Sequence, residues 1–139
     1  TRTARRQRRS RSGEPMIYGI GTDIADVRRF AKWVENPDLI ERFFNKREIK
    51  TSGSRQTLQE HYASRFAVKE AFSKALGTGV AGFELGDIYV GHNEDGKPEL
   101  YLEGSAAGLV ERRCGKGARI FVSLSHEKEY TVAFVVIEV

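Results

Sequence analysis

Apolar and polar positions divide the first part of the chain into a strand and two short helices. Residues 17–24 are apolar apart from glycines and small polar residues, which predicts a strand. Apolar residues recur at helical spacing over residues 25–35, and Asn36-Pro37 breaks that pattern. Asp38 can cap a second short helix over residues 39–44.

The strongest helical pattern covers residues 57–76. This stretch is rich in Ala, Leu, Glu and Lys, and it stops at Gly77, before a glycine-rich loop over residues 78–82. Alanines stand at positions 63, 67, 71 and 75. Because these side chains are small, the helix can lie close against a sheet or a neighbouring chain.

The second half of the chain is rich in strand patterns. Strands are predicted at residues 87–92, 99–102, 119–125 and 130–139, with a helix at residues 105–113. The last strand is apolar on both faces, which is typical of a central strand or of one at a subunit interface. The whole pattern predicts an α+β fold with a mainly antiparallel sheet packed with a long helix.

Composition adds limits to this picture. With 139 residues, of which 40% are hydrophobic and 30% charged, the chain suits one soluble globular domain. No apolar run approaches the roughly 20 residues that span a bilayer. Cys114 is the single cysteine, which excludes an internal disulfide, and a cytoplasmic enzyme is the default expectation.

The basic charge of the chain resides in its first 15 residues. Six arginines and one glutamate give residues 1–15 a formal charge of +5, so residues 16–139 carry −1 of the total of +4. We expect residues 1–15 to be a disordered leader, an artificial or upstream remnant, with Met16 as the natural start of the domain over residues 16–139. The alternative is a basic arm that binds nucleic acid.

Two acidic residues are candidates for a metal site. Asp23 closes a glycine-containing apolar strand, where it either binds a metal ion or caps the following helix. Glu70 lies on an apolar helix face with Lys74, where it either binds a metal ion or forms a surface ion pair with Lys74. Two carboxylates with phosphate oxygens suit Mg²⁺, and Lys69 and Lys74 would be phosphate-facing cations beside it.

Two further segments offer polar groups to a ligand. Gly77, Thr78 and Gly79 follow the long helix, and their amides either approach a phosphate or form a plain helix cap and turn. Ser125 and His126 end a strand, where His126 is a base, a phosphate contact or a turn residue. No Gly-x-Ser-x-Gly elbow surrounds Ser125, which disfavours a serine hydrolase.

A set of basic residues lies on the first two predicted helices. The set includes Arg28, Arg29, Lys32 and Arg42. Such charges form either a solvated helix face or a docking surface for an acidic partner, where complementary charge mainly raises the rate of association.

Two segments together resemble the signature blocks of holo-acyl-carrier-protein synthases, which are phosphopantetheinyl transferases. The blocks are Gly-Ile-Gly-Thr-Asp-Ile at residues 19–24 and Arg-Phe-Ala-Val-Lys-Glu-Ala-Phe-Ser-Lys-Ala-Leu-Gly-Thr-Gly at residues 65–79. The turn at residues 96–98 and the segment at residues 123–126 also fit, and only the leader lies outside the resemblance. Asp26 departs from the family pattern, which often has Glu there, so its role is open.

The resemblance implies a homotrimer with active sites between neighbouring chains. It implies transfer of phosphopantetheine from coenzyme A to a serine of apo-acyl carrier protein, with release of adenosine 3′,5′-bisphosphate, in fatty acid or polyketide synthesis. It implies that Asp23 and Glu70 bind Mg²⁺ with the diphosphate of coenzyme A, and that the first helix, especially Arg29, receives the carrier protein. The residues that it implies around coenzyme A are Arg65, Lys69, Lys74, Gly77, Thr78, Gly79, Ser125 and His126.

The expected reaction suggests a role for Lys74 and leaves the identity of the general base open. Lys74 is our candidate for stabilising the charge on the leaving group. The base is Glu70 or a metal-polarised water, with Asp23 as the alternative. A rival class, a nucleic-acid-binding module that uses the leader, lacks a recognised reading motif and has a slightly acidic domain. A second rival, another nucleotide phosphotransferase, lacks the Gly-x-x-x-x-Gly-Lys-Ser/Thr loop.

Overall fold

Two antiparallel sheets organise the part of the chain that the computed structural model describes, residues 13–139. One sheet has the strand order β1-β5-β4, and β2 pairs with β3 in the other. The strands are β1 (Ile17–Asp26), β2 (Ile88–His92), β3 (Pro98–Leu102), β4 (Arg119–His126) and β5 (Tyr130–Glu138). The predicted α+β class is confirmed, whereas the predicted leader falls mostly on residues 1–12, which lie outside the described residues.

The helices agree with the predicted pattern except near the start. The α-helices are α1 (Ala31–Val34), α2 (Pro37–Phe43), α3 (Arg55–Leu76) and α4 (Gly104–Cys114), and the 3₁₀ helices are η1 (Val27–Phe30), η2 (Lys46–Glu48) and η3 (Leu85–Asp87). The single helix expected over residues 25–35 is η1 followed by α1, because β1 continues to Asp26. Asn36, not Asp38, caps α2: its side chain accepts from Leu39 N at 3.2 Å.

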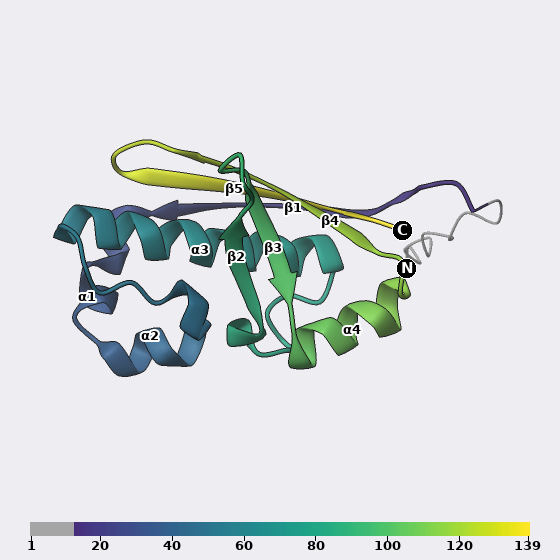
Figure 1. Ribbon diagram of the computed structural model, residues 1–139, viewed down its shortest axis with the longest axis horizontal. Helices are drawn as coiled ribbons and strands as arrows, with labels where there is room; N and C mark the ends of the chain where they lie inside the picture. The colour runs from purple at the N-terminus through teal and green to yellow at the C-terminus, as the bar shows by residue number, and fades with distance from the viewer. Residues whose placement is uncertain (1–12) are drawn as a thin grey trace, which may run out of the picture.

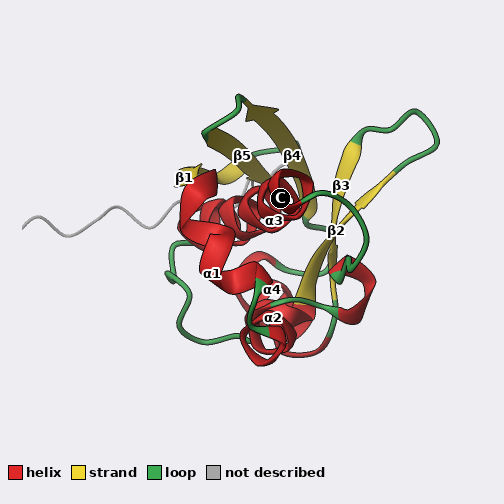
Figure 2. Ribbon diagram, turned by 90° about the vertical axis from the view of Figure 1, so that its left-hand side faces the viewer, coloured by secondary structure: helices red, strands yellow, loops and turns green. Residues whose placement is uncertain are grey.

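Helix α3 forms the middle layer of the molecule. Figures 1 and 2 both show it between the three-stranded sheet and a layer that contains α1, α2 and α4. Ser54 caps its N-terminus, and Gly77 ends it in a left-handed conformation with φ of 84°. Among the described residues, no helix is long and apolar enough to cross a membrane.

Two glycines bring β1 into backbone contact with α3. A Cβ at Gly21 would lie 1.8 Å from the carbonyl oxygen of Ala71, and one at Gly19 would lie 2.0 Å from that of Ala75. Both distances are far below van der Waals contact, so only glycine fits at these positions. The prediction that small residues let α3 lie close to the sheet is confirmed, and this contact sets how far β1 side chains lie from α3.

Strand β5 is central in its sheet, as its apolar pattern predicts. Its inner face is buried against α3 through Thr131, Ala133, Val135 and Ile137. The outer face of the sheet is apolar but exposed. Its large exposed residues include Ile20 and Ile24 of β1, Phe121 of β4 and Phe134 of β5.

Candidate active site

Asp23 faces helix α3 from the middle of β1. It pairs with Ala133 of β5, which is fully buried, and it stands between Thr22 and Ile24, which are exposed on the outer face. Side chains alternate along a strand, so the carboxylate lies on the α3 side, where 19% of the side chain remains exposed. The alternative role as a helix cap is wrong for Asp23.

Asp26 is the residue that caps η1. Its Oδ1 accepts from Arg28 N at 2.9 Å, and the carboxylate also receives Nε and Nη2 of the Arg28 side chain. These bonds hold the pKa of Asp26 below its usual value. The role of Asp26, which the sequence left open, is therefore to cap η1, and Asp23 does not cap it.

Lys74 of α3 reaches across to β1. Its Nζ donates to Thr22 O at 2.9 Å and to Asp23 Oδ1 at 3.3 Å. Within residues 13–139, no ion pair joins it to Glu70, so the alternative of a surface Glu70–Lys74 pair is wrong. Lys74 instead neutralises part of the charge of Asp23.

Glu70 completes a cluster of acidic and basic groups. Burial raises its pKa, and the negative charge of Asp23 raises it further. The positive charges of Lys74 and Arg29 oppose this rise. The cluster therefore joins Asp23, Glu70, Lys74 and Arg29, and within it the charge of Asp23 acts on Glu70.

This pair of carboxylates suits a hard divalent cation. No group of three or more His, Cys, Asp or Glu that could hold a metal occurs among residues 13–139. Magnesium, however, often takes only one or two carboxylates and completes its octahedron with water and phosphate oxygens. A cation between Asp23 and Glu70 would also relieve the repulsion that raises the pKa of Glu70.

A large cavity opens beside Lys74 at the C-terminal end of α3. Its volume is about 860 Å³, and its walls come from β1, the end of α3 and α4. Its lining residues include Tyr18, Ile20, Lys74, Gly77, Arg112 and Arg113. Three cations and no acidic residue line it, so it favours an anionic ligand.

A second cavity of about 270 Å³ lies around the N-terminal half of α3. Arg65 and His126 line it together with Lys50, His61 and one acidic residue, Glu60. Arg65 Nε is buried and has no hydrogen-bond partner among the described residues, although Nη1 donates to His61 O at 3.3 Å. An unsatisfied buried guanidinium nitrogen fits an anionic oxygen.

His61 carries no charge at neutral pH in this cavity. Burial lowers its pKa from 6.5 to about 4, and the neighbouring charge of Arg65 acts in the same direction. Its Nε2 lies 2.5 Å from the carbonyl oxygen of Glu48, so this nitrogen carries the proton and donates.

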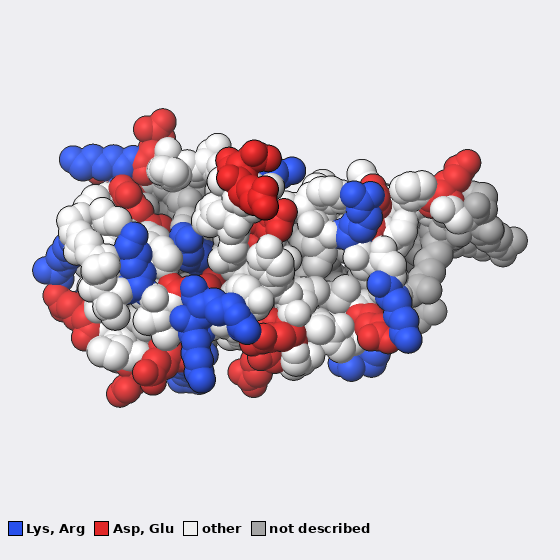
Figure 3. Space-filling model, in the orientation of Figure 1, with Lys and Arg blue, Asp and Glu red and all other residues white. Residues whose placement is uncertain are grey.

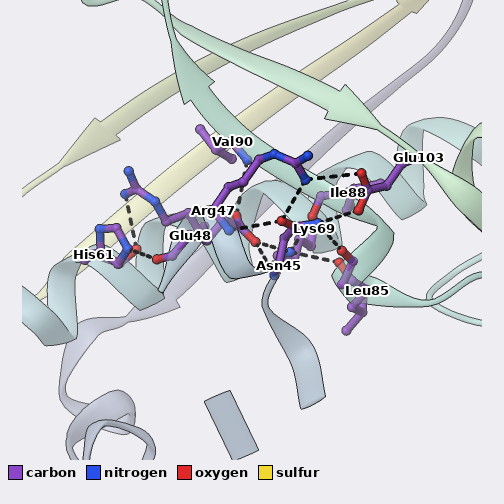
Figure 4. A network of polar contacts seen from close by, with 11 residues as sticks. Asn45, Arg47, Glu48, His61, Lys69, Leu85, Ile88, Val90 and Glu103 are labelled. Carbon is purple, nitrogen blue, oxygen red and sulfur yellow. Dashed lines mark hydrogen bonds and ion pairs between the residues drawn. The ribbon is translucent and has the colours of Figure 1, made fainter. Parts of the chain in front are cut away.

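Lys69 is not at this site, and the prediction that it faces phosphate is wrong. Its side chain is completely buried, and Nζ donates to Glu48 Oε1, Leu85 O and Ile88 O at 2.6, 2.8 and 2.6 Å (Figure 4). An ammonium group has three protons, and all three are occupied. Burial lowers the pKa of Lys69, and Glu48 opposes that effect.

The remaining predicted ligand contacts lie further from the carboxylate pair. Ser125 stands beside Val132 on β5, on the outer face of the sheet, which α3 does not cover. Gly77 is a helix cap that also lines the large cavity, whereas Thr78 and Gly79 are not among its lining residues. For Ser125, Thr78 and Gly79, contact with coenzyme A stays a prediction.

The predicted docking residues are all exposed but not equally available. Arg28 is bound to Asp26 and lies 3.7 Å from Glu129, and Arg42 packs over the Phe43 ring. Lys32 and Arg29 make no hydrogen bond or ion pair with any described residue, and Arg29 influences the pKa of Glu70.

Sequence reasoning missed four basic residues that line the two cavities. Arg112 and Arg113 end α4, where paired arginines are usually only a solvated, dipole-complementing helix end. Lys50 lies in a polar connection, and His61 had no identifiable partner in the sequence. Only the packing of distant segments places Arg112 and Arg113 beside Lys74 and Lys50 beside Arg65, whereas His61 precedes Arg65 by one turn of α3.

Comparison with known proteins identifies the family. The model of the 4′-phosphopantetheinyl transferase superfamily matches residues 19–135, a range that contains the carboxylate pair and both cavities' walls on α3. The chain belongs to this superfamily. Within it, the chain is a phosphopantetheinyl transferase of the holo-acyl-carrier-protein synthase type.

Individual relatives of this superfamily support the narrower assignment. The chain is 47% identical over 124 residues to the holo-[acyl-carrier-protein] synthase of Treponema denticola, which covers 88% of this chain and 99% of the relative. The crystal structure of the Neisseria meningitidis synthase has a TM-score of 0.76 and 34% identity, over 88% and 98% of the two chains. The Bacillus anthracis synthase, solved in complex with CoA (3′,5′-ADP), has a TM-score of 0.70 and 37% identity, over 88% and 97%.

Proposed function

We propose that this transferase moves the phosphopantetheine arm of coenzyme A onto a serine of apo-acyl carrier protein and releases adenosine 3′,5′-bisphosphate. The single observation that carries the proposal is the grouping of Asp23, Glu70 and Lys74, with a basic cavity at the C-terminal end of α3 and a cavity that contains the buried Arg65 near its N-terminal half. Coenzyme A carries several phosphate groups, which suit these cations. A nucleic-acid-binding module is not favoured.

The chemistry follows from the charges of these side chains. The serine oxygen forms a bond to the phosphorus that bears the pantetheine arm, and the bond from that phosphorus to the leaving phosphate oxygen breaks. The serine proton would go to Glu70, to Asp23 or to a water molecule beside them, since the acceptor must lie within hydrogen-bond reach of the hydroxyl. Lys74, which already reaches the same edge of β1, stabilises the negative charge on the leaving bisphosphate.

Asp23 and Glu70 would hold Mg²⁺ in this proposal. When bound, the ion neutralises charge on the diphosphate oxygens. The effect of the Asp23 charge on the pKa of Glu70, and the position of Lys74 Nζ 3.3 Å from Asp23 Oδ1, support the assignment. Lys74 would then exchange its contact with Asp23 for one with phosphate.

A homotrimer is the proposed assembly. Ile20, Ile24 and Phe134 are 69%, 64% and 55% exposed on the outer face of the sheet, which leaves a large apolar surface facing water. Burial of this face between copies would stabilise each subunit and would bring Ser125 of one copy beside another copy. The active sites would then lie between neighbouring chains, in a cytoplasmic enzyme of fatty acid or polyketide synthesis.

The acyl carrier protein would dock on the first helical segment. Arg28, Arg29, Lys32 and Arg42 are exposed there, and a carrier with an acidic recognition helix would be steered to them. The influence of Arg29 on the pKa of Glu70 supports a docking position next to the reaction centre.

Mass spectrometry of an apo-acyl carrier protein tests the reaction. After incubation with coenzyme A, Mg²⁺ and the enzyme, we expect the carrier to gain one phosphopantetheine group on serine. A carrier in which that serine is alanine serves as the control and should not change mass. Unchanged mass of the intact carrier over repeated preparations would refute the function.

A further inference from the structure

A buried polar network ties α3 to two segments that the proposed reaction does not use. Figure 4 shows Lys69 of α3 at its centre, enclosed by η2 and by the chain that leads into β2. The side chains of Lys69 and Glu48 are both 0% exposed, and their Nζ–Oε1 distance is 2.6 Å. Burial of two charges is costly, so a fully bonded pair of this kind needs a structural reason.

Every polar atom of the pair is satisfied. Glu48 Oε1 also accepts from Asn45 N at 3.0 Å, and Oε2 accepts from Val90 N at 3.2 Å. The network continues from Asn45, whose Nδ2 donates to Gly86 O and to Glu103. A satisfied network in a low-dielectric interior is rigid, and it fixes one arrangement of the elements that it joins.

The backbone of Glu48 also contacts the wall of the smaller cavity, which Arg65 and His61 line. Its carbonyl oxygen accepts from His61 Nε2, and the carbonyl oxygen of His61 in turn accepts from Arg65 Nη1 at 3.3 Å. Glu48 therefore binds Lys69 through its carboxylate and the His61 ring through its carbonyl oxygen. Because Lys69 precedes Glu70 and His61 lies one turn before Arg65, both proposed ligand residues on α3 are next to a residue that Glu48 binds.

We infer that Glu48 and Lys69 are positioning residues, which hold α3 in the register that presents Glu70 and Arg65 to coenzyme A. The inference rests on the proposed function. On the opposite side, α3 is fixed by the backbone contacts of Gly19 and Gly21 with Ala71 and Ala75. The helix is thus held from both sides, and displacement by about 1 Å is enough to reduce catalysis by roughly 100-fold.

Two kinds of variant separate a positioning role from direct contact with coenzyme A. Lys69→Met leaves the Glu48 carboxylate buried without its cation, and we expect kcat to fall at least tenfold and the Kd for adenosine 3′,5′-bisphosphate to rise at least fivefold. The double variant Glu48→Met/Lys69→Met replaces the pair by apolar side chains, which often preserves a fold. It should bring that Kd back to within threefold of the wild-type value and recover most of kcat.

Calorimetry measures the bisphosphate affinity, and thermal unfolding shows that each variant is folded at the assay temperature. Lys116→Met is the matched control, because Lys116 is a surface lysine with an ion pair to Glu111, and it should leave both readouts unchanged. If Lys69→Met does not fold, Glu48→Gln, which keeps the shape of the side chain, must show the same losses to a smaller extent.

The positioning role is wrong if the folded double variant binds the bisphosphate as poorly as Lys69→Met, since direct contact would then explain the loss. It is equally wrong if a folded Lys69→Met or Glu48→Gln has wild-type kcat and Kd. Failure of the proposed function is a separate outcome: the wild-type enzyme would then transfer no phosphopantetheine to a carrier.

Discussion

Asp23 and Glu70 are positioned by different elements, since Asp23 belongs to strand β1 and Glu70 to helix α3. Asp23 lies on the α3 side of β1 because of the strand's alternation, and its Oδ1 already has a cationic neighbour in Lys74. Glu70 has no such partner at bonding distance among the described residues, and burial raises its pKa. The charge of Asp23 is therefore already partly balanced by Lys74, whereas the charged form of Glu70 would be stabilised more by a bound cation.

Neutralising either carboxylate should abolish transfer with little effect on folding. Asp23→Asn and Glu70→Gln keep the side-chain shape but remove the charge that would hold Mg²⁺, so we expect kcat to fall on the order of 10²–10³-fold. Steady-state assays across Mg²⁺ concentrations, with thermal unfolding in parallel, measure both effects. Wild-type activity and Mg²⁺ dependence in either variant would contradict the metal assignment.

His61 should make stability depend on pH in the acidic range. Its folded-state pKa is about 4, whereas the unfolded chain keeps the ordinary value of 6.5. Between these values the unfolded chain binds more protons, so the contribution of His61 is fully present above pH 6.5 and is lost as the pH falls towards 4.

Urea unfolding at about pH 7 and about pH 5 measures this dependence. His61→Gln can still donate to Glu48 O but does not titrate, so its stability should fall less between the two pH values. Identical losses in the wild-type chain and the variant would show that other groups cause the decline.

At the scale of elements, the contact between β1 and α3 determines the site. No side chain lies between the backbone of the strand at Gly21 and that of the helix at Ala71. On α3, Glu70 and Lys74 lie beside this contact, whereas Arg65 lies on a different face of the helix, one turn before Lys69 and its buried network.

Gly21→Ala should weaken both stability and activity. The added methyl group would meet the carbonyl oxygen of Ala71 at 1.8 Å, so β1 must move, at a cost of about 1–3 kcal/mol of unfolding free energy. Movement of β1 displaces Asp23, so kcat should fall as well. Denaturant unfolding and transfer assays test this, with Gly117→Ala as the control because nothing lies within 4 Å of a Cβ there.

Many of the helices and strands could be predicted from the sequence, because each depends on the spacing of apolar residues within a short segment. Periodicity gave α3 within two residues of its start, and the apolar character of both faces of β5 gave its central place in the sheet. The fate of Lys69 could not be predicted, because its partner Glu48 lies 21 positions away and no local pattern marks a buried pair. Arg112 was missed for the same reason, since its cavity forms only when α4 packs near β1.

At the scale of the whole molecule, charge is dispersed while apolar surface is concentrated. Lys and Arg side chains are interspersed with Asp and Glu over the face seen in Figure 3, in keeping with the charge of −1 for residues 16–139. The outer face of the three-stranded sheet, by contrast, presents several large exposed apolar side chains. Dispersed charge suits recognition of a ligand or partner by a few cations at one place. The apolar outer face of the sheet suits self-association.

Arg29→Glu should weaken the carrier protein more than coenzyme A. Placing a negative charge opposite an acidic helix should raise the KM for the carrier roughly tenfold or more, while the KM for coenzyme A changes little. Initial rates with each substrate varied in turn separate the two constants. Lys116→Glu, an exposed charge reversal at the end of α4, is the control. An unchanged carrier KM in Arg29→Glu would remove this residue from the docking surface.

Phe134→Asp should dissociate the proposed trimer. The residue is 55% exposed in the single chain and lies at the centre of the outer face, so a carboxylate buried between copies would be strongly unfavourable. Light scattering coupled to size exclusion should give the mass of one chain for the variant and of three for the wild type. Val80→Asp, at an exposed apolar residue outside the sheet, should retain the wild-type mass.

The meeting of main chains at Gly19 and Gly21 has a consequence for how this enzyme can vary over time. Main-chain atoms, which every amino acid has, set the distance between β1 and α3 there. Substitutions elsewhere should therefore have little effect on the distance between Asp23 and Glu70. Substitutions that accumulate in the two cavities can therefore change which molecules bind, while the distance between β1 and α3 at the proposed reaction centre stays constant.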